Sequence, residues 1–186
     1  LIYKIDRSKT LSVFAGSENV CRHGGDDGLA TAATLLSPDG LTINFDQLFF
    51  VENDANGYVR FINLNTGVIG TLIGGGLSNA NGTAPENYLL ERPRNIAVAD
   101  SGDFFISIGD RIITWNTFDN LVIDFAGVPG RSGFGGDDGP ALEALFDNIE
   151  ALAVDPAGEN LLVVDNGNFR IREIDLETKI VTTLFG

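Results

Sequence analysis

The chain has 186 residues and carries 26 acidic against 12 basic side chains, so its formal net charge at pH 7 is −14. Because affinity for a polyanion comes from cations that release condensed counterions, this charge argues against RNA, DNA and anionic membranes as partners. No run of 18 apolar residues is present, so no membrane-spanning helix is predicted.

The first strand-like segments belong to a sequence that repeats along the chain. Residues 2–6 align with residues 171–175, which places the start of the chain in the second half of a repeat. An apolar pair followed by glycine ends each unit, at Gly16, Gly74, Gly127 and Gly186, with steps of 58, 53 and 59 residues. This period predicts a partial unit over residues 1–16 and complete units over residues 17–74, 75–127 and 128–186.

A segment rich in glycine and aspartate follows the first unit end. Gly24-Gly25-Asp26-Asp27-Gly28-Leu29-Ala30 returns as Gly135-Gly136-Asp137-Asp138-Gly139-Pro140-Ala141. The near-identity predicts that both segments adopt the same conformation as connections between units. A short helical turn is expected to start at Ala30 and at Ala141 and to direct Leu35 and Phe146 inward.

The four aspartates of these segments are weak candidates for a calcium site. Asp26 with Asp27, and Asp137 with Asp138, offer adjacent oxygen ligands of the kind that calcium prefers. However, aspartates that accept hydrogen bonds from backbone amides would hold such a turn without a metal. The spaced ligand set of a calcium loop is also missing. We therefore favour the structural interpretation and assign no cofactor.

Within each unit the apolar pattern is that of short strands. The third unit contains four apolar runs, at residues 149–154, 161–164, 169–174 and 179–184. Turn sequences such as Asn56-Gly57 and Asn166-Gly167 separate such runs and predict tight hairpins with positive φ. Each unit is thus expected to be a four-stranded antiparallel sheet.

The alternation of polar and apolar residues changes across a unit. First strands, such as residues 95–99 and 151–154, alternate poorly, whereas later strands regain polar residues. Because burial on both faces removes the polar alternation, we predict that the first strands lie at the inner edge. The strands at residues 68–73, 121–125 and 180–184 are predicted to lie at the outer edge.

The third unit resembles the NHL repeat, a β-propeller blade. The resemblance rests on residues 164–175, on Leu152-Ala153-Val154-Asp155 and Gly158 before them, and on a loop similar to residues 135–146. It covers the whole chain and is weakest where residues 76–90 replace the Gly-Asp motif. It implies an all-β fold, a β-propeller with three complete four-stranded antiparallel blades and a partial one. Phe169 stands where the family usually carries histidine, so an apolar contact is expected there.

The ends of this segment raise a separate question. A propeller protects its sheet edges by closing into a ring of commonly four to eight blades, and three blades with a partial one cannot close. Open ends would expose apolar blade faces. The surfaces near residues 2–6 and 180–185 are therefore expected to be covered, either by further blades of the same polypeptide or by an adjacent copy.

The catalytic inventory of the sequence is small. His23 is the only histidine and Cys21 the only cysteine. A dyad would need these side chains to face each other with a third, orienting group, and at a spacing of two in a glycine-rich loop we interpret them as loop residues. Propeller lyases use several histidines or converging carboxylates at the central channel. No catalytic residue is assigned.

Several surface residues are candidates for contacts. Asn81-Gly82-Thr83 is the single N-glycosylation sequon, which makes Asn81 the glycosylation candidate. Trp115, near a turn, is a candidate for a glycan or protein contact, whereas the other aromatics are expected in the core. Arg92, Arg94 and Arg111 would form a small basic spot unless they pair with the abundant acids.

The resemblance implies no single function, because NHL proteins include RNA binders, protein binders, a lyase and extracellular modules. The leading interpretation is a noncatalytic propeller scaffold for protein or glycan interaction or for self-assembly. High acidity and few lysines favour an extracellular location. One alternative is part of a lyase or lactonase whose catalytic residues lie outside this segment, and another is a calcium-stabilised adhesive module.

Overall fold

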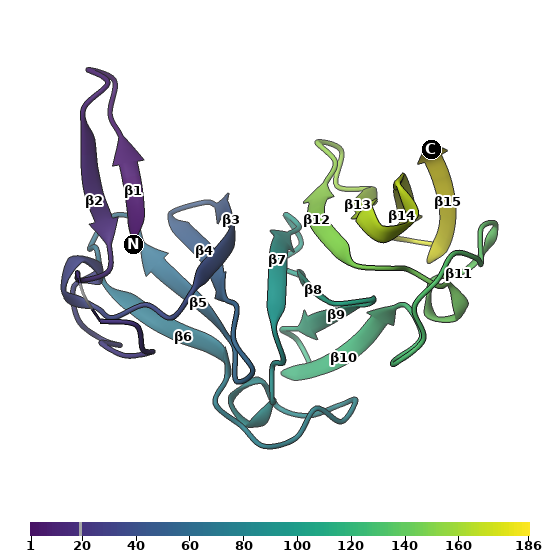
Figure 1. Ribbon diagram of the computed structural model, residues 1–186, viewed down its shortest axis with the longest axis horizontal. Helices are drawn as coiled ribbons and strands as arrows, with labels where there is room; N and C mark the ends of the chain where they lie inside the picture. The colour runs from purple at the N-terminus through teal and green to yellow at the C-terminus, as the bar shows by residue number, and fades with distance from the viewer. Residues whose placement is uncertain (19) are drawn as a thin grey trace.

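Antiparallel sheets follow one another around an arc in the computed structural model (Figure 1), which describes residues 1–18 and 20–186. A partial sheet contains β1 (Ile2–Ile5) and β2 (Leu11–Ala15). Blade 1 contains β3 (Pro38–Asn44), β4 (Gln47–Glu52), β5 (Tyr58–Asn63) and β6 (Ile69–Gly74). Blade 2 contains β7 (Pro93–Val98), β8 (Phe104–Ile108), β9 (Arg111–Asn116) and β10 (Leu121–Ala126). Blade 3 contains β12 (Ile149–Val154), β13 (Asn160–Asp165), β14 (Arg170–Asp175) and β15 (Ile180–Phe185).

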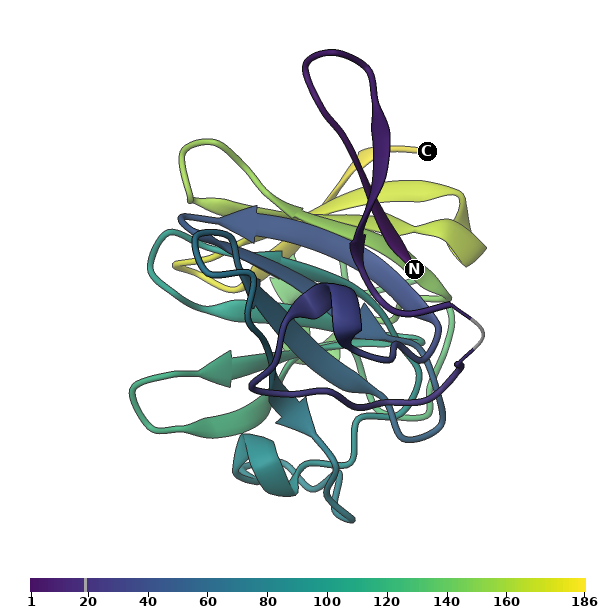
Figure 2. The same ribbon diagram turned by 90° about the vertical axis from the view of Figure 1, so that its left-hand side faces the viewer.

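Each blade pairs its strands in chain order, which confirms the predicted four-stranded antiparallel sheets. A short strand, β11 (Gly139–Pro140), adds a fifth member to blade 3 by pairing with β15, which the sequence pattern did not predict. The first strands lie along the concave side of the arc, where β7 contacts both β3 and β12, and the last strands lie outside (Figure 1). The β1–β2 hairpin projects beyond the blades (Figure 2).

The first strands lie where they are predicted, but burial on both faces, the reason given for it, applies to β7, where Ile96 and Ala97 are both buried, and not to β3. In β3, Asp39, Leu41 and Ile43 are exposed, whereas β4 is buried from Leu48 to Glu52. An inner strand has a free sheet edge that solvent reaches. The second strand is flanked by strands on both sides and by packed side chains on both faces, so burial removes the polar alternation there instead.

The core lies between the sheets. Neighbouring residues of one strand face opposite directions, so Phe49 packs into the cluster between blades 1 and 2, whereas Phe50 packs into the cluster between blade 1 and the partial sheet. Phe104 and Phe105 divide in the same way between the two seams of blade 2. Each blade is therefore stabilised through both of its neighbours.

The two Gly-Asp loops adopt matching conformations, as predicted. Asp27 and Asp138 have left-handed φ values of 62° and 60°. The short helices η1 (Ala30–Ala32) and η3 (Ala141–Glu143) follow, and Leu35 and Phe146 are buried. In the second unit, the replaced segment contains η2 (Pro85–Asn87).

The two Asn-Gly sequences do not form the tight turns expected of them. Neither Gly57 nor Gly167, in η4 (Asn166–Asn168), has a positive φ. A Cβ on Gly57 would lie 2.4 Å from Pro93 Cδ, and one on Gly167 would lie 2.5 Å from Asp147 Cγ. These glycines allow the second turn of a blade to approach its neighbouring chain closely. The left-handed residue is Phe169, with φ 55°, and it is 86% exposed, so its expected apolar contact is not formed.

A buried arginine fixes each Gly-Asp loop to its own blade. Arg172 of β14 is fully buried and donates to the carbonyls of Leu145 (2.7 Å) and Gly135 (2.9 Å) and to the Asp137 carboxylate (2.7 Å). Thr183 donates to the other oxygen of Asp137 at 2.7 Å. Buried polar groups must be paired to avoid a large desolvation cost, and here one side chain pairs both ends of the loop.

Blade 1 contains the same arrangement around Arg60, which is also fully buried. It donates to the carbonyls of Thr34 (3.1 Å) and Gly24 (3.2 Å), to Asp26, and to the buried Glu52 (3.1 Å). We call these two sets the arginine clamps.

Blade 2 lacks the clamp. By strand register Ile113 occupies the position of the two arginines, and Tyr88 from the replaced loop is buried beside it. A polar network has thus been exchanged for an apolar one in the middle blade, where the Gly-Asp motif is also missing.

Replacing Asp137 by asparagine tests the clamp. Burial raises the pKa of the Asp137 carboxyl, but hydrogen bonds from Thr183 and Arg172 outweigh it and hold this pKa below its ordinary value of 3.8. We expect Asp137→Asn to lower the unfolding free energy at neutral pH by about 2–4 kcal/mol, because Arg172 keeps a buried charge with a weaker partner. Because the pKa of Asp137 is lowered in the folded state, the stabilisation by its carboxylate is fully present above about pH 4 and is lost as the pH falls. Urea denaturation should therefore show a smaller difference in unfolding free energy between wild type and Asp137→Asn at about pH 3 than at neutral pH.

Asp138→Asn is the matched control. Asp138 is exposed, its φ of 60° is tolerated by asparagine, and its side chain makes no hydrogen bond within the described part of the chain. It should lose less than about 0.5 kcal/mol at either pH. An equal loss in both variants, or a difference that widens on acidification, contradicts the clamp.

Replacing Gly57 by alanine tests the close approach of the chains. The added Cβ would meet Pro93 Cδ and the Glu52 carbonyl oxygen at 2.6 Å or less, so we expect a loss of about 1–3 kcal/mol of unfolding free energy. Gly135→Ala is the control, since nothing lies within 4 Å of its added Cβ and its φ is ordinary. Thermal and urea denaturation measure both, and equal stability of the two variants would refute the steric explanation.

Candidate functional site

The four aspartates named as weak calcium candidates have different surroundings in the structure. Asp26 and Asp137 bind the clamp arginines, whereas Asp27 and Asp138 occupy exposed left-handed positions. Among residues 1–18 and 20–186, no group of three or more histidine, cysteine, aspartate or glutamate side chains is placed to hold a metal ion. The clamp arginines were missed by the sequence analysis, although Arg60 and Arg172 recur with almost the same offset as the aspartates.

His23 joins the clamp of blade 1 and does not pair with Cys21. Its Nδ1 lies 2.7 Å from Glu52 Oε2, its Nε2 lies 3.3 Å from Thr71 Oγ1, and its ring stacks on Tyr58 at 3.7 Å. Hydroxyl, imidazole and carboxylate are connected as in a hydrolase triad. The fully buried Glu52 also accepts from Arg60 and the Leu36 amide, so the same carboxylate holds the loop. Cys21 is exposed.

The remaining surface candidates have separate environments. Asn81 is exposed, and its Oδ1 accepts a hydrogen bond from the Asp124 amide at 2.9 Å. Trp115 packs its ring 5.0 Å from Phe104, in the core between blades 1 and 2, and its Nε1 donates to Asn120.

The predicted basic spot is divided between different acids. Arg94 pairs with Glu150 of β12 at 3.5 Å, whereas Arg111 pairs with Asp124 of β10. Arg92 is exposed before β7 with a φ of 49°. Arg94 and Arg111 therefore pair with acids, which is the alternative that the sequence left open.

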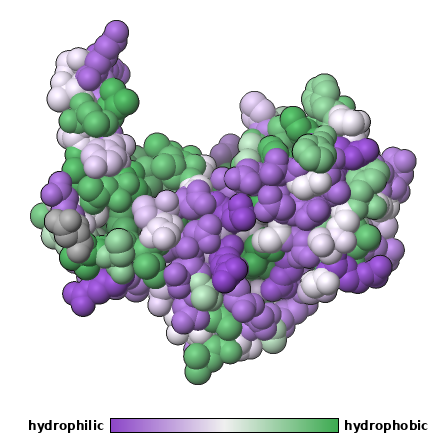
Figure 3. Space-filling view, viewed as in Figure 1, coloured by the Kyte–Doolittle hydropathy of each residue, from purple (hydrophilic) through white to green (hydrophobic). Residues whose placement is uncertain are grey.

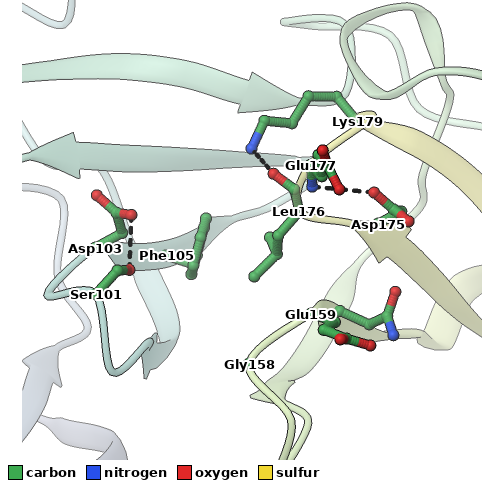
Figure 4. Close-up of a pocket in the computed structure, with 10 residues that line it drawn as sticks. Ser101, Asp103, Phe105, Gly158, Glu159, Asp175, Leu176, Glu177 and Lys179 are labelled. Atoms are coloured by element: carbon green, nitrogen blue, oxygen red, sulfur yellow. Dashed lines mark hydrogen bonds between the residues drawn. The ribbon is translucent and has the colours of Figure 1, made fainter.

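A cavity of about 520 Å³ lies between blades 2 and 3 and was not predicted (Figure 4). Ser101, Asp103 and Phe105 of blade 2 line one side. Turns of blade 3 line the other side with Gly158, Glu159, Asn160, Asp175, Leu176, Glu177 and Lys179. Figure 4 shows Phe105 and Leu176 between the two sets of polar side chains. The floor is therefore apolar and the walls are mostly acidic.

A second cavity, of about 230 Å³, shares Asp103, Phe105 and Lys179 with the first. It continues across blade 2 along Thr114, Asn116, Ile123 and Phe125. We call the two joined cavities the seam groove.

Local hydrogen bonds explain how the chain forms the acidic wall. Asp155 accepts from the Glu159 amide at 2.9 Å and from Asn160, and Asp175 accepts from the amides of Glu177 and Thr178 at 3.0 and 2.6 Å. Such aspartate turns are local and independent of packing. They leave the Glu159 and Glu177 side chains exposed at the groove.

The groove carries negative charge at neutral pH. Hydrogen bonds from Thr178 lower the pKa of the Asp175 carboxyl below its ordinary value. The Lys179 ammonium is the cation of the lining residues. It donates to the Leu176 carbonyl and lies 5.1 Å from the centre of the Phe125 ring. The lining of the larger cavity thus contains four carboxylates, those of Asp103, Glu159, Asp175 and Glu177, and one lysine.

No helix in the described residues is long and apolar enough to cross a membrane. No protein-family model matches the sequence, and no curated protein matches it.

Solved structures do resemble the chain. A structure of the nidogen/laminin complex matches with a TM-score of 0.58 and 12% identity over 85% of this chain and 50% of that one. An auxiliary nutrient binding protein from Bacteroides thetaiotaomicron matches with 0.57 and 19% identity over 72% and 36%. A catalytically inactive virginiamycin B lyase from Staphylococcus aureus, with quinupristin, matches with 0.50 and 19% identity over 80% and 41%.

The chain spans half or less of the length of these three proteins. At identities below 20%, the likeness concerns the fold alone. Together with the four-stranded antiparallel blades, it supports assignment of the chain to the β-propeller fold.

Proposed function

We propose that this chain is a noncatalytic interaction module, an NHL-type segment of a β-propeller, and that its seam groove binds a partner macromolecule. The observation that carries the proposal is the groove itself. It comprises two adjoining cavities, of about 520 and 230 Å³, and turns held by internal hydrogen bonds line the larger one. Small-molecule sites are concave and usually preformed, and we extend this form to a segment of a larger partner that enters the groove.

The likeness to a structure of the nidogen/laminin complex supports protein as the class of partner. The acidic composition, with net charge −14, and the small number of lysines favour an extracellular location. A glycan is the other partner class of this proposal. A lyase or lactonase function would require catalytic residues beyond this segment.

Site-directed crosslinking tests this proposal. A photoreactive amino acid at Ser101, exposed at the rim of the groove, should capture a partner that mass spectrometry identifies, whereas one at Asn166, exposed on η4 outside the groove lining, should not. The indole of Ser101→Trp would occupy part of the groove and displace the partner from it. The purified partner should then bind this variant at least about tenfold more weakly than wild type, since each Å² of apolar burial that the partner loses costs about 25 cal/mol. Equal binding to wild type, Ser101→Trp and Asn166→Trp would refute the groove as the site.

We also propose that the two ends of the arc are covered in the working protein. By the repeat alignment, β1 corresponds to β14 of blade 3. Among the described residues, β1 pairs with β2 alone, whereas β14 pairs with both β13 and β15, so one edge of β1 is open. Figure 3 shows apolar side chains gathered near the β1–β2 end. The exposed apolar residues at that end are Tyr3, Ile5, Leu11, Val13, Leu41 and Ile43. Contiguous patches of this kind mark association surfaces.

Light scattering over a range of concentrations tests whether a second copy can cover these ends. Wild type should associate, and Ile5→Asp with Ile43→Asp should reduce association, because both side chains are more than half exposed, at 70% and 59%. Leu77→Asp is the control, since Leu77 is 95% exposed in the connection between blades 1 and 2. A monodisperse wild-type monomer would contradict self-association and leave further blades of the polypeptide as the cover.

A further inference from the structure

The seam groove has a shape suited to an extended chain. Its lining starts at the β7–β8 turn and crosses β8, β9 and β10. Neighbouring strands lie about 4.8 Å apart, so this path is roughly 10–15 Å long. An extended polypeptide advances about 3.3 Å per residue, and three to five residues would fill the groove.

The charges of the groove select the chemistry of that chain. Asp103, Glu159, Asp175 and Glu177 line the walls, and Phe105 with Leu176 forms the floor. An anionic ligand would be repelled by these carboxylates. A segment in which lysine or arginine alternates with apolar residues would direct its apolar side chains to the floor and its cations toward the rim, where Glu159 and Glu177 are exposed, because alternate residues of an extended chain face opposite sides.

Lys179 shows how a cation fits in the groove. Its ammonium lies 5.1 Å from the centre of the Phe125 ring and donates to the Leu176 carbonyl. An ammonium within about 6 Å of an aromatic face is attracted to it. The chain thus places one of its own cations, Lys179, which lines both cavities, against the Phe125 ring of the smaller cavity.

We propose that the seam groove binds an extended segment of a partner protein in which basic and apolar residues alternate, and that Lys179 competes with the segment for its position. This inference rests on the proposed function, because it names the ligand of the same groove. Charge complementarity between the four carboxylates and a cationic segment carries it.

The probe is the peptide acetyl-Lys-Leu-Lys-Leu-Lys-amide, fluorescently labelled and titrated with the chain, with acetyl-Glu-Leu-Glu-Leu-Glu-amide as its counterpart. The lysine peptide should bind, and the glutamate peptide should bind at least tenfold more weakly. Glu159→Gln with Glu177→Gln should raise the Kd of the lysine peptide about threefold to tenfold, as expected for two exposed charge pairs. Lys179→Gln should lower it about threefold.

The control is Glu86→Gln with Glu143→Gln, two exposed glutamates outside the groove lining. It changes the net charge of the chain equally, so it separates the groove from the overall field of the protein. Its Kd should stay within about twofold of wild type.

Equal binding of both peptides, or an equal effect of the groove and control pairs, overturns the inference. A partner that crosslinks at Ser101 but binds the Glu159→Gln/Glu177→Gln variant as tightly as wild type also overturns it, while the proposed function stands; a neutral glycan would give this result. Failure of the proposed function gives a different result, namely a partner whose affinity Ser101→Trp leaves unchanged.

Discussion

The structure depends on the pairing of a buried guanidinium with the backbone of the loop that joins two blades. Arg172 accounts for the carbonyls of Gly135 and Leu145 and for the Asp137 carboxylate, and Arg60 does the same for the first loop. Glycine-rich loops have much conformational entropy to lose on folding. A rigid fork with five donors can satisfy several acceptors at once, so one side chain holds the glycine-aspartate stretch at the start of each loop, residues 24–28 and 135–139, which has no apolar side chain.

Blade 2 shows what replaces this clamp when its parts are absent. In blades 1 and 3 the second strand ends with an acid near the arginine, Glu52 at 3.1 Å from Arg60 and Asp165 at 3.7 Å from Arg172. In blade 2 the Gly-Asp motif, the arginine and this acid are missing together, and Ile113 and Ile108 replace the arginine and the acid. A lone arginine in that position would leave a buried charge without partners, which is strongly destabilising. The members of the clamp are therefore retained or lost as a set, which explains why the second unit resembles the other units least.

Much of the fold follows from the sequence, because hairpin turns, the apolar runs and the repeat are local signals. The strand order, the matching loops and the buried Leu35 and Phe146 were predicted in this way. The clamps were not, because a guanidinium reaching residues 26–37 positions away in the chain leaves no local pattern. The seam groove was missed for a related reason. Its acids read as turn residues, and their convergence depends on how blade 3 packs against Phe105.

The groove exists at the seam of blades 2 and 3 because of an exchange of side chains between equivalent positions. In blade 1, Phe61 pairs with Phe49 and its ring lies against Gly70, where a Cβ added to the glycine would be 2.6 Å from the ring. In blade 2, Thr114 pairs with Phe105 and Ile123 replaces the glycine. Phe61 therefore fills the seam toward blade 2, together with Trp115 of the facing blade. The shorter Thr114 leaves the corresponding space as the outer cavity of the groove. Of the three seams, the one between blades 1 and 2 is filled by Phe61 and Trp115, whereas cavities of about 220 and 230 Å³ lie at the seam of the partial sheet with blade 1 and at the seam of blades 2 and 3. The side chains at equivalent positions thus decide which seams of the repeated scaffold are open.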